Sequence, residues 1–140
     1  MIILDTNVVS EMMRPSPNMK VLARLERFDF ASVFITTITI QELYFGLTLV
    51  RETERYEPLM KRIVDLHEIK FAGRIFTYDA EAVQIGGRLQ AEQKLRGEVI
   101  DYGDMQIAAI AIIKNFVVVT RNTKDFVHTG VKIYNPWEQS

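Results

Sequence analysis

The sequence predicts an α/β fold, a three-layer arrangement in which helices cover both faces of a central, mostly parallel sheet. Segments of strand composition alternate with segments of helical periodicity along the whole chain. The clearest strands are solidly apolar, which is typical of parallel strands that are buried on both faces. No repeat, low-complexity tract or linker interrupts the 140 residues. We therefore expect a single domain over residues 1–140.

Punctuating residues divide the first half of the chain into strands and helices. The run Arg14-Pro15-Ser16-Pro17 ends the first helix, and Asn18 is a candidate cap for the second. Thr39 and Glu42 match the Thr-x-x-Glu capping box at the start of the third helix. The fourth helix is amphipathic, with a break expected near Pro58. The expected strands are 2–4 and 33–36, and the expected helices are 7–13, 18–27, 39–50 and 52–69.

The second half of the chain follows the same alternation. The strongest strand signal is the run Phe-Val-Val-Val-Thr at 116–120, because β-branched and aromatic side chains favour strands. Asp79 is a candidate cap for a long helix over 80–96, which Gly97 closes. Residues 100–103 are expected to form a loop before an apolar helix over 104–114. Short strands are expected at 74–76 and 131–134.

Composition and charge exclude several classes of protein. The chain contains no Cys, which excludes a thiol nucleophile, a Cys-ligated zinc site and a disulfide framework. No apolar run approaches the roughly 18 residues that span a bilayer, and no signal peptide is recognisable, so we expect a cytoplasmic protein without a membrane partner. The formal net charge is -1, so global charge does not indicate nucleic-acid binding. A nucleic-acid substrate would have to be attracted by a local basic patch and by bound cations.

Carboxylate and hydroxyl side chains fall at the carboxyl ends of several expected strands, where open α/β sheets bind their ligands. Asp5 follows the first strand, Glu42 lies early in the helix after the second, and Asp104 begins the helix before the 116–120 strand. That strand is followed by Thr120, Arg121, Asn122 and Asp125. These residues meet only if the strand order is as predicted, because spacing alone does not bring them together.

The composition of this group favours a hard metal ion. Carboxylates gathered without His or Cys suit Mg²⁺ or Mn²⁺ better than Zn²⁺. Without a cation they would repel one another and raise their own pKa values. Metal-assisted phosphodiester hydrolysis is the chemistry that most readily uses such a site, because the metal lowers the pKa of water and stabilises charge on the phosphate.

Five short motifs occur along the chain, namely Asp5-Thr6-Asn7, Ile40-Gln41-Glu42-Leu43, the Asp-x-x-Ile-Ala-Ala motif at 104–109, the Thr-Arg-Asn-x-x-Asp-Phe motif at 120–126 and the closing Asn135-Pro136-Trp137. Taken together, they resemble the PIN-domain family, in particular ribonuclease toxins of the VapC and FitB type. The similarity runs over nearly the whole chain, in the family order.

The resemblance implies an activity, a cofactor and partners. It implies a metal-dependent endoribonuclease, the toxin of a type II toxin–antitoxin system, usually a homodimer that a cognate antitoxin silences by placing a peptide segment in the active-site groove. Asp5, Glu42 and Asp104 would bind Mg²⁺ or Mn²⁺, directly or through water. The metal would activate water for in-line attack on an RNA phosphodiester.

The fourth acidic position is where the sequence departs from some relatives. Asn122 stands where some members carry Asp, and Asp125 follows three residues later. Either side chain would complete the site, and fewer carboxylates would hold a second cation less well. Thr6 and Thr120 offer hydroxyls that support the metal ligands. Asn7 either orients Asp5 or starts the first helix.

Several of these residues also have purely structural interpretations. Asp5 alone would serve as a helix cap, Glu42 as the partner of the Thr39 capping box, and Asp125 as a turn residue. Asp101 is interpreted as a cap or loop residue. The charged runs Arg51–Arg55 and Lys61-Arg62 are interpreted as a solvated helix face. The preferred candidates for phosphate contact flank the proposed site, and they are Arg14, Arg121 and Lys124.

Three other functions compete with a nuclease. A haloacid-dehalogenase-like phosphatase needs Asp at the position of Asn7, and a dinucleotide-binding domain needs a Gly-x-Gly-x-x-Gly motif that does not follow the first strand. The alternative that stays open is a catalytically weak or inactive PIN-like module that binds RNA or a partner, because Asn122 is neutral. Clustered Asp5, Glu42 and Asp104 argue against that module, since they would repel a polyanion.

Overall fold

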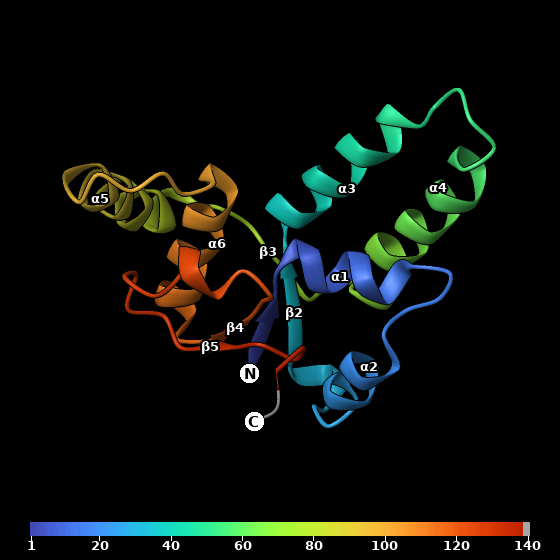
Figure 1. Cartoon of the computed structure of the whole chain (residues 1–140), viewed down its shortest axis with the longest axis horizontal. Coiled ribbons are helices and arrows are strands. Elements are labelled where there is room, and N and C mark those ends of the chain that lie inside the picture. Colours follow the sequence, from blue (N-terminus) through green and yellow to red (C-terminus); the bar gives the residue numbers. More distant parts are fainter. Residues whose placement is uncertain (139–140) are drawn as a thin grey trace.

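A parallel sheet forms the centre of the molecule in the computed structural model, which describes residues 1–138. Residues 139 and 140, the end of the expected domain, lie outside the described part. Within that part the sheet has five strands in the order β3-β2-β1-β4-β5, and every pair is parallel. The strands are β1 (Ile2–Leu4), β2 (Val33–Thr36), β3 (Ile75–Phe76), β4 (Val117–Val119) and β5 (Ile133–Tyr134). Figure 1 shows β1 between β2 and β4.

The sheet carries a topological switch point between β1 and β4. Ile3 of β1 is in register with Phe34 of β2 on one side and with Val118 of β4 on the other. From β1 the chain proceeds outward through β2 and β3, and it then returns to the other side of β1 for β4 and β5. A crevice outside the carboxyl ends of the strands is expected where the strand order reverses in this way. Asp5 and Thr120 follow the two strands that flank this point.

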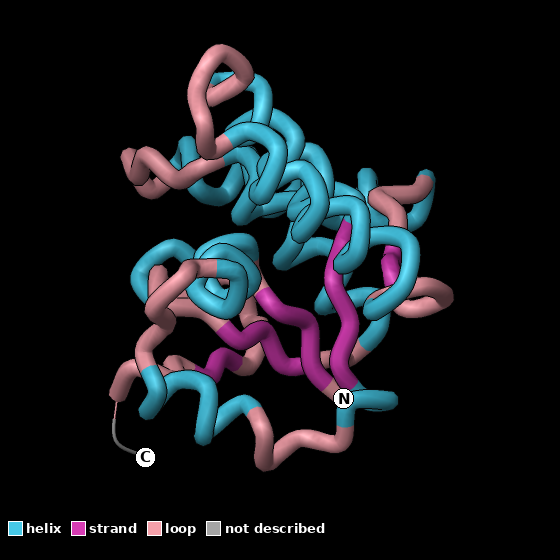
Figure 2. Tube along the Cα trace, turned by 90° about the vertical axis from the view of Figure 1, so that its right-hand side faces the viewer, coloured by secondary structure: helices cyan, strands magenta, loops and turns pink. Residues whose placement is uncertain are grey.

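Helices cover both faces of the sheet, as the apolar strands predicted (Figures 1 and 2). One core contains Ile2, Leu4 and Val119 with side chains of α1, α3 and α4, and the other contains Ile3 and Val118 with side chains of α5 and α6. Neighbouring residues of a strand point to opposite faces, so both cores are built from the same strands. The helices are α1 (Thr6–Met13), α2 (Met19–Leu25), α3 (Thr37–Leu49), α4 (Tyr56–Asp65), α5 (Ala80–Leu95) and α6 (Tyr102–Lys114).

The start of α3 differs from the prediction. The helix begins at Thr37, and its N-cap is Thr36, whose hydroxyl accepts a hydrogen bond from the backbone N–H of Thr39 at 3.3 Å. The predicted capping box of Thr39 and Glu42 is therefore wrong. Both threonines satisfy the local rule for a cap, and the position of the strand end decides between them. The shift frees the Glu42 side chain from a capping role.

Two other helices depart from their expected boundaries. Helix α6 begins at Tyr102 with Asp101 at the N-cap position, so the expected loop over 100–103 is partly helical. Pro58 does not break α4, because it occupies the first turn, where a backbone N–H has no partner within the helix. Helix α4 continues instead into a π-helical turn, η2 (Leu66–Lys70).

Short 3₁₀ helices occupy segments for which no element was expected, η1 (Phe30–Ser32) and η3 (Thr123–Asp125). Other local predictions are confirmed. The side chain of Asp79 accepts a hydrogen bond from Ala82 N–H and caps α5, and Gly97 follows that helix with a φ of 72°. Asn18 caps α2. Among the described residues no helix has the length and apolarity needed to cross a membrane.

Candidate functional site

Asp5 lies at the carboxyl end of β1, buried at the switch point with 2% of its surface exposed. Its backbone N–H donates to Val119 O at 2.9 Å, which fixes the residue beside the end of β4. Oδ1 accepts from Thr6 N–H at 2.8 Å, so Asp5 caps α1 as its structural interpretation requires. Oδ2 accepts from the Thr120 hydroxyl at 2.8 Å and from the Asn7 amide at 3.2 Å. Three groups, two from the start of α1 and one from the end of β4, therefore hold this carboxylate.

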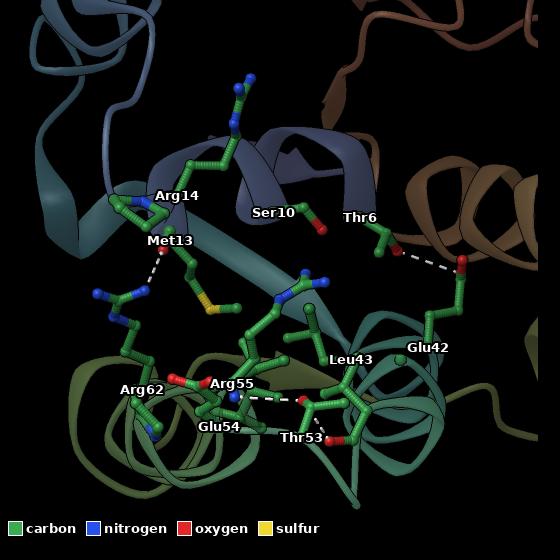
Figure 3. A pocket seen from close by; sticks show the side chains of 16 residues that line it. Thr6, Ser10, Met13, Arg14, Glu42, Leu43, Thr53, Glu54, Arg55 and Arg62 are labelled. Atoms are coloured by element: carbon green, nitrogen blue, oxygen red, sulfur yellow. Dashed lines mark hydrogen bonds between the residues drawn. The ribbon is translucent and has the colours of Figure 1, made fainter.

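The carboxylate of Glu42 is positioned by two threonine hydroxyls. Oε1 lies 3.1 Å from Thr6 Oγ1, which in turn lies 2.9 Å from Oγ1 of the buried Thr39 (Figure 3 shows the first of these bonds). A carboxylate only accepts hydrogen bonds, so the Thr6 hydroxyl donates to Glu42. Thr6 has one hydroxyl proton, and Thr39 must therefore donate to Thr6. The direction of the whole chain of hydroxyls is fixed by the charge at its end.

Asp104 and Asp125 are joined by the side-chain amide of Asn122. Nδ2 of Asn122 donates to Asp104 Oδ2 at 2.9 Å and to Asp125 Oδ2 at 2.6 Å. Both carboxyl groups are nearly buried. The backbone N–H of Asn122 donates to Thr120 Oγ1 at 2.9 Å, which ties this group to the partners of Asp5. Asn122 and Asp125 therefore both lie in the cluster, where they are joined by a hydrogen bond.

Burial and mutual repulsion make these carboxyl groups hard to ionise. Removal from water raises the pKa of Asp5 and of Glu42, and it is the largest cause in each case. Burial, followed by the charge of Asp5 and by contact with Asp125, raises the pKa of Asp104 to about 8. The charge of Asp101 raises all three pKa values. Asp5, Glu42 and Asp104 therefore share one electrostatic environment, although they come from distant parts of the chain.

Comparison with known proteins identifies the family to which the chain belongs. A model of the PIN domain matches residues 2–132. The chain belongs to the PIN-domain family. It is 36% identical to VapC ribonuclease Y4jK of Sinorhizobium fredii over 99% of both chains. It is also 36% identical to Toxin FitB of Neisseria gonorrhoeae, over 98% of this chain and 99% of that one.

Solved structures of PIN-domain proteins agree with this assignment. The crystal structure of FitAcB from Neisseria gonorrhoeae superposes with a TM-score of 0.87 at 34% identity, covering 99% of this chain and all of that one. The structure of FitAB bound to an IR36 DNA fragment superposes with a TM-score of 0.90, also at 34% identity, covering 100% of this chain and 98% of that one. The predicted family and the predicted α/β/α architecture are confirmed.

The sequence predicts only a cap or loop role for Asp101, but in this PIN domain the residue lies close to the acidic cluster. It occupies the N-cap position of α6, but its side chain makes no capping hydrogen bond. A Cβ atom on Gly103 would lie 3.1 Å from Glu42 Oε1 and 3.4 Å from Asp101 Oδ2, so both carboxylates lie against the same glycine. Asp101 and Asp104 are three residues apart, a spacing that places two side chains on one face of a helix. The expected helix began at Asp104, so this spacing did not reveal that the two residues are neighbours.

The side-chain oxygens of the acidic cluster fit a hard divalent cation, but the acidic side chains do not converge on one point. Asp5, Glu42 and Asp104 offer only oxygen atoms, which Mg²⁺ and Mn²⁺ prefer. Within residues 1–138 no three acidic or histidine side chains converge closely enough to ligate one ion together. Their oxygens are held by hydroxyl, amide and backbone N–H groups instead. Bridging waters or small side-chain rotations would complete such a site.

The residues expected to contact phosphate come from separate segments of the chain, with Arg14 after α1, Arg121 after β4 and Lys124 in η3. Arg121 donates its backbone N–H to Asn7 Oδ1 at 3.1 Å, and its guanidinium lies 5.1 Å from the centre of the Trp137 ring. Lys124 is exposed on η3. Asn7 orients Asp5 through its side-chain N–H, and its side-chain oxygen also holds the loop after β4 against the start of α1.

A cavity of about 750 Å³ lies between α1, α3 and α4, and Thr6 and Glu42 are part of its wall. Arg14 lines it, as do Arg55 and Arg62. The latter two are exposed, in keeping with a solvated helix face. The interpretation as a solvated helix face is nevertheless incomplete, because α4 packs against α3 and both arginines line the cavity next to the site.

Proposed function

We propose that this PIN-domain protein is a metal-dependent endoribonuclease, the toxin of a type II toxin–antitoxin system. The observation that carries the proposal is the cluster of buried carboxyl groups at the switch point of the sheet. Relatives of the chain are named VapC ribonuclease and Toxin FitB. A buried acidic cluster is costly for folding unless a ligand uses it. Phosphodiester hydrolysis assisted by a divalent cation is a use that suits oxygen ligands.

Asp5, Glu42 and Asp104 are the proposed ligands of Mg²⁺ or Mn²⁺, directly or through water. The bound cation would supply a water molecule of lowered pKa and would neutralise charge that develops on the phosphate. A cation would also remove the repulsion that raises the pKa values of these acids. Asn122 and Asp125 complete the catalytic group, with Asn122 holding Asp104 and Asp125 in place.

The surrounding side chains orient the acids and keep their oxygens in defined directions. Thr120 and Asn7 hold one oxygen of Asp5, which leaves little freedom for that carboxylate to rotate. Thr6 performs the same task for Glu42. Such preorganisation matters because a ligand that must be reordered on binding costs conformational free energy. Arg121 is a proposed contact for a phosphate of the substrate.

Partners and location follow from the same assignment. The similar structures FitAB and VapBC are complexes with a second protein, and we propose a cognate antitoxin as the partner of this chain. We also propose a homodimer, since Phe45 and Leu49 of α3 are 66% and 70% exposed although they are large and apolar. A cytoplasmic site of action and a single domain over residues 1–140 remain predictions from the sequence.

A binding module without catalysis is the second candidate, and Asn122 is the observation that favours it. Its amide replaces the carboxylate that a fourth acidic ligand would supply. It nevertheless donates to two carboxyl groups of the cluster, a role that a nuclease site uses equally well. The two candidates differ in what happens to RNA after it is bound, so the test must measure cleavage.

The deciding experiment is cleavage of a mixed RNA pool by the purified protein with Mg²⁺, with Mn²⁺ and with EDTA. The pool is also treated with Asp5→Asn, Asp104→Asn and the control Asp29→Asn. Asp29 caps η1 at the opposite end of β2, and Asn preserves that cap. We expect metal-dependent cleavage by the wild type and the control only. Cleavage that persists in EDTA, or in either site variant, would contradict the metal-site assignment.

A further inference from the structure

The cavity between α1, α3 and α4 joins the proposed catalytic site to the outer surface. Figure 3 shows Thr6 and Glu42 at one side of it and Arg62 at the other. Its floor is largely apolar, with Leu43 of α3 and Leu59 and Ile63 of α4. The volume of about 750 Å³ exceeds what a single bound water or ion requires. A segment of an extended ligand fits a hollow of this kind.

The charged side chains that line the cavity are mostly cationic. Apart from Glu42 they are Arg14, Glu54, Arg55 and Arg62, so three guanidinium groups stand against one carboxylate. The whole chain carries a formal charge of -1, and the charged residues of the neighbouring cluster are all acidic. The positive charge of this wall therefore contrasts locally with both the site and the molecule.

Two of the three guanidinium groups are available to a ligand. Arg14 is paired with Glu11 at 3.2 Å, and in Figure 3 it extends away from the cavity. Arg62 uses one N–H for the carbonyl of Met13 at 3.1 Å, which anchors it and leaves its other donors free. Among the described residues no hydrogen bond or ion pair engages the side chain of Arg55, which extends into the cavity in Figure 3.

We propose that this cavity holds the stretch of single-stranded RNA next to the scissile bond, with Arg55 and Arg62 binding its phosphates. The inference rests on the proposed function, because it extends the path of a substrate that is cut at the acidic cluster. A polynucleotide must leave that cluster along an adjacent surface, and the acids themselves repel its backbone. A planar guanidinium matches two phosphate oxygens at once, and an apolar floor suits the ribose and base faces.

A protein segment is the competing occupant, and charge favours RNA over it. The apolar floor alone would accept an amphipathic peptide. The available guanidinium groups of Arg55 and Arg62, with Glu54 as the single opposing charge outside the site, are complementary to a polyanion. The continuity of the cavity with Glu42 places this wall beside the bond that is to be cut.

The test measures RNA binding without cleavage. Full-length protein in EDTA is titrated into a fluorescein-labelled single-stranded oligouridylate, and the anisotropy gives Kd at several salt concentrations. The variants are Arg55→Gln, Arg62→Gln, the double variant and Arg55→Lys. The control is Arg27→Gln, which removes the same charge from an exposed position after α2, outside the cavity.

We expect Arg55→Gln and Arg62→Gln each to weaken binding several-fold and to reduce the slope of log K against log salt by about 0.7, the value for one phosphate contact on a single strand. The double variant should lose about twice that slope, while Arg55→Lys and Arg27→Gln should keep it. Equal slopes and affinities in all variants would overturn the inference and would favour a protein segment as the occupant.

The outcome is separable from that of the proposed function. A wild type that cleaves RNA with Mg²⁺ while its groove variants bind oligouridylate unchanged would retain the nuclease and exclude this path. A wild type that does not bind oligouridylate at all would also exclude it. Loss of binding in the groove variants supports the path whether or not the Asp5→Asn experiment succeeds.

Discussion

Asn122 donates a hydrogen bond from Nδ2 to Asp104 Oδ2 at 2.9 Å, so a neutral amide holds a carboxyl group whose pKa is raised to about 8. The same nitrogen donates to Asp125 at 2.6 Å. A carboxylate at position 122 would place a third acceptor between two others. The amide therefore stabilises the metal-free cluster in a way that an acid would not.

Asn122→Asp is predicted to lower the unfolding free energy of the metal-free protein and to raise its affinity for Mg²⁺. Loss of two hydrogen bonds and added repulsion should lower the unfolding free energy in EDTA by about 2 kcal/mol. An additional anionic oxygen should tighten binding of Mg²⁺. Urea unfolding and calorimetric titration measure the two effects, and Asn122→Ala is the control that removes the bonds without adding charge. Unchanged Mg²⁺ affinity would place this side chain outside the metal site.

The stability of the metal-free protein should depend on pH through Asp104. Its pKa is raised in the folded state from 3.8 to about 8, so the folded protein prefers the protonated form. The stabilisation is complete below the unfolded pKa and is lost as the pH rises through the folded one. We expect the unfolding free energy in EDTA to fall between about pH 4 and pH 8.

Two comparisons test that assignment. Asp104→Asn should flatten the decline, because it removes the titrating group, and Mg²⁺ should suppress the decline in the wild type. The raised pKa values of Asp5 and Glu42 act in the same direction, so some slope should remain in the variant. A pH profile that is identical in wild type and Asp104→Asn would show that this carboxyl group is not the source. Urea unfolding in a series of buffers provides the data.

Thr39→Val is predicted to impair cleavage while preserving the fold. The hydroxyl of Thr39 donates to Thr6, which donates to Glu42, so its loss removes a constraint on that carboxylate. We expect kcat to fall about tenfold with little change in KM, as for other groups that orient metal ligands. Thr39→Ser retains the hydroxyl and should restore activity. Full activity in the valine variant would limit Thr39 to packing.

The adjacent glycines of α5 should respond to alanine in opposite directions. A Cβ on Gly86 would lie 2.0 Å from Tyr78 Oη, whereas one on Gly87 would have no atom within 4 Å. Gly86→Ala should lower the unfolding free energy by about 1–2 kcal/mol, because the tyrosine must leave its position. Gly87→Ala should raise it by about 0.5–1 kcal/mol through helix propensity. Thermal unfolding of the two variants checks the sign of each.

Local chemistry was sufficient for the elements that depend on short-range rules. The apolar runs at 2–4 and 117–119 are strands because they are buried on both faces, and their composition predicts this directly. Asp79 caps α5, and Asn18 caps α2, through hydrogen bonds to N–H groups two or three residues away. The acids Asp5, Glu42 and Asp104 could be predicted as site residues because they lie at the ends of strands or at the starts of helices.

Local chemistry could not choose between equivalent alternatives. Thr36 and Thr39 are both acceptable caps for α3, and the choice depends on where β2 ends. Once Thr36 takes that role, Thr39 turns to Thr6, which lies 33 positions earlier in the chain. Asp101 looks like a cap from its neighbours alone, yet its charge raises the pKa values of Asp5 and Glu42.

By itself, the sequence determined the family and the parallel sheet, and it predicted the acidic site residues and the kind of ion that they suit, because each depends on residue type and short spacing. Only the tertiary structure decided how those residues work together. Asn122 joins Asp104 to Asp125, and Arg55 and Arg62 change from a charged helix face into the wall of a cavity beside Glu42. Both outcomes depend on packing between distant segments, and a local pattern carries no information about which segments will meet.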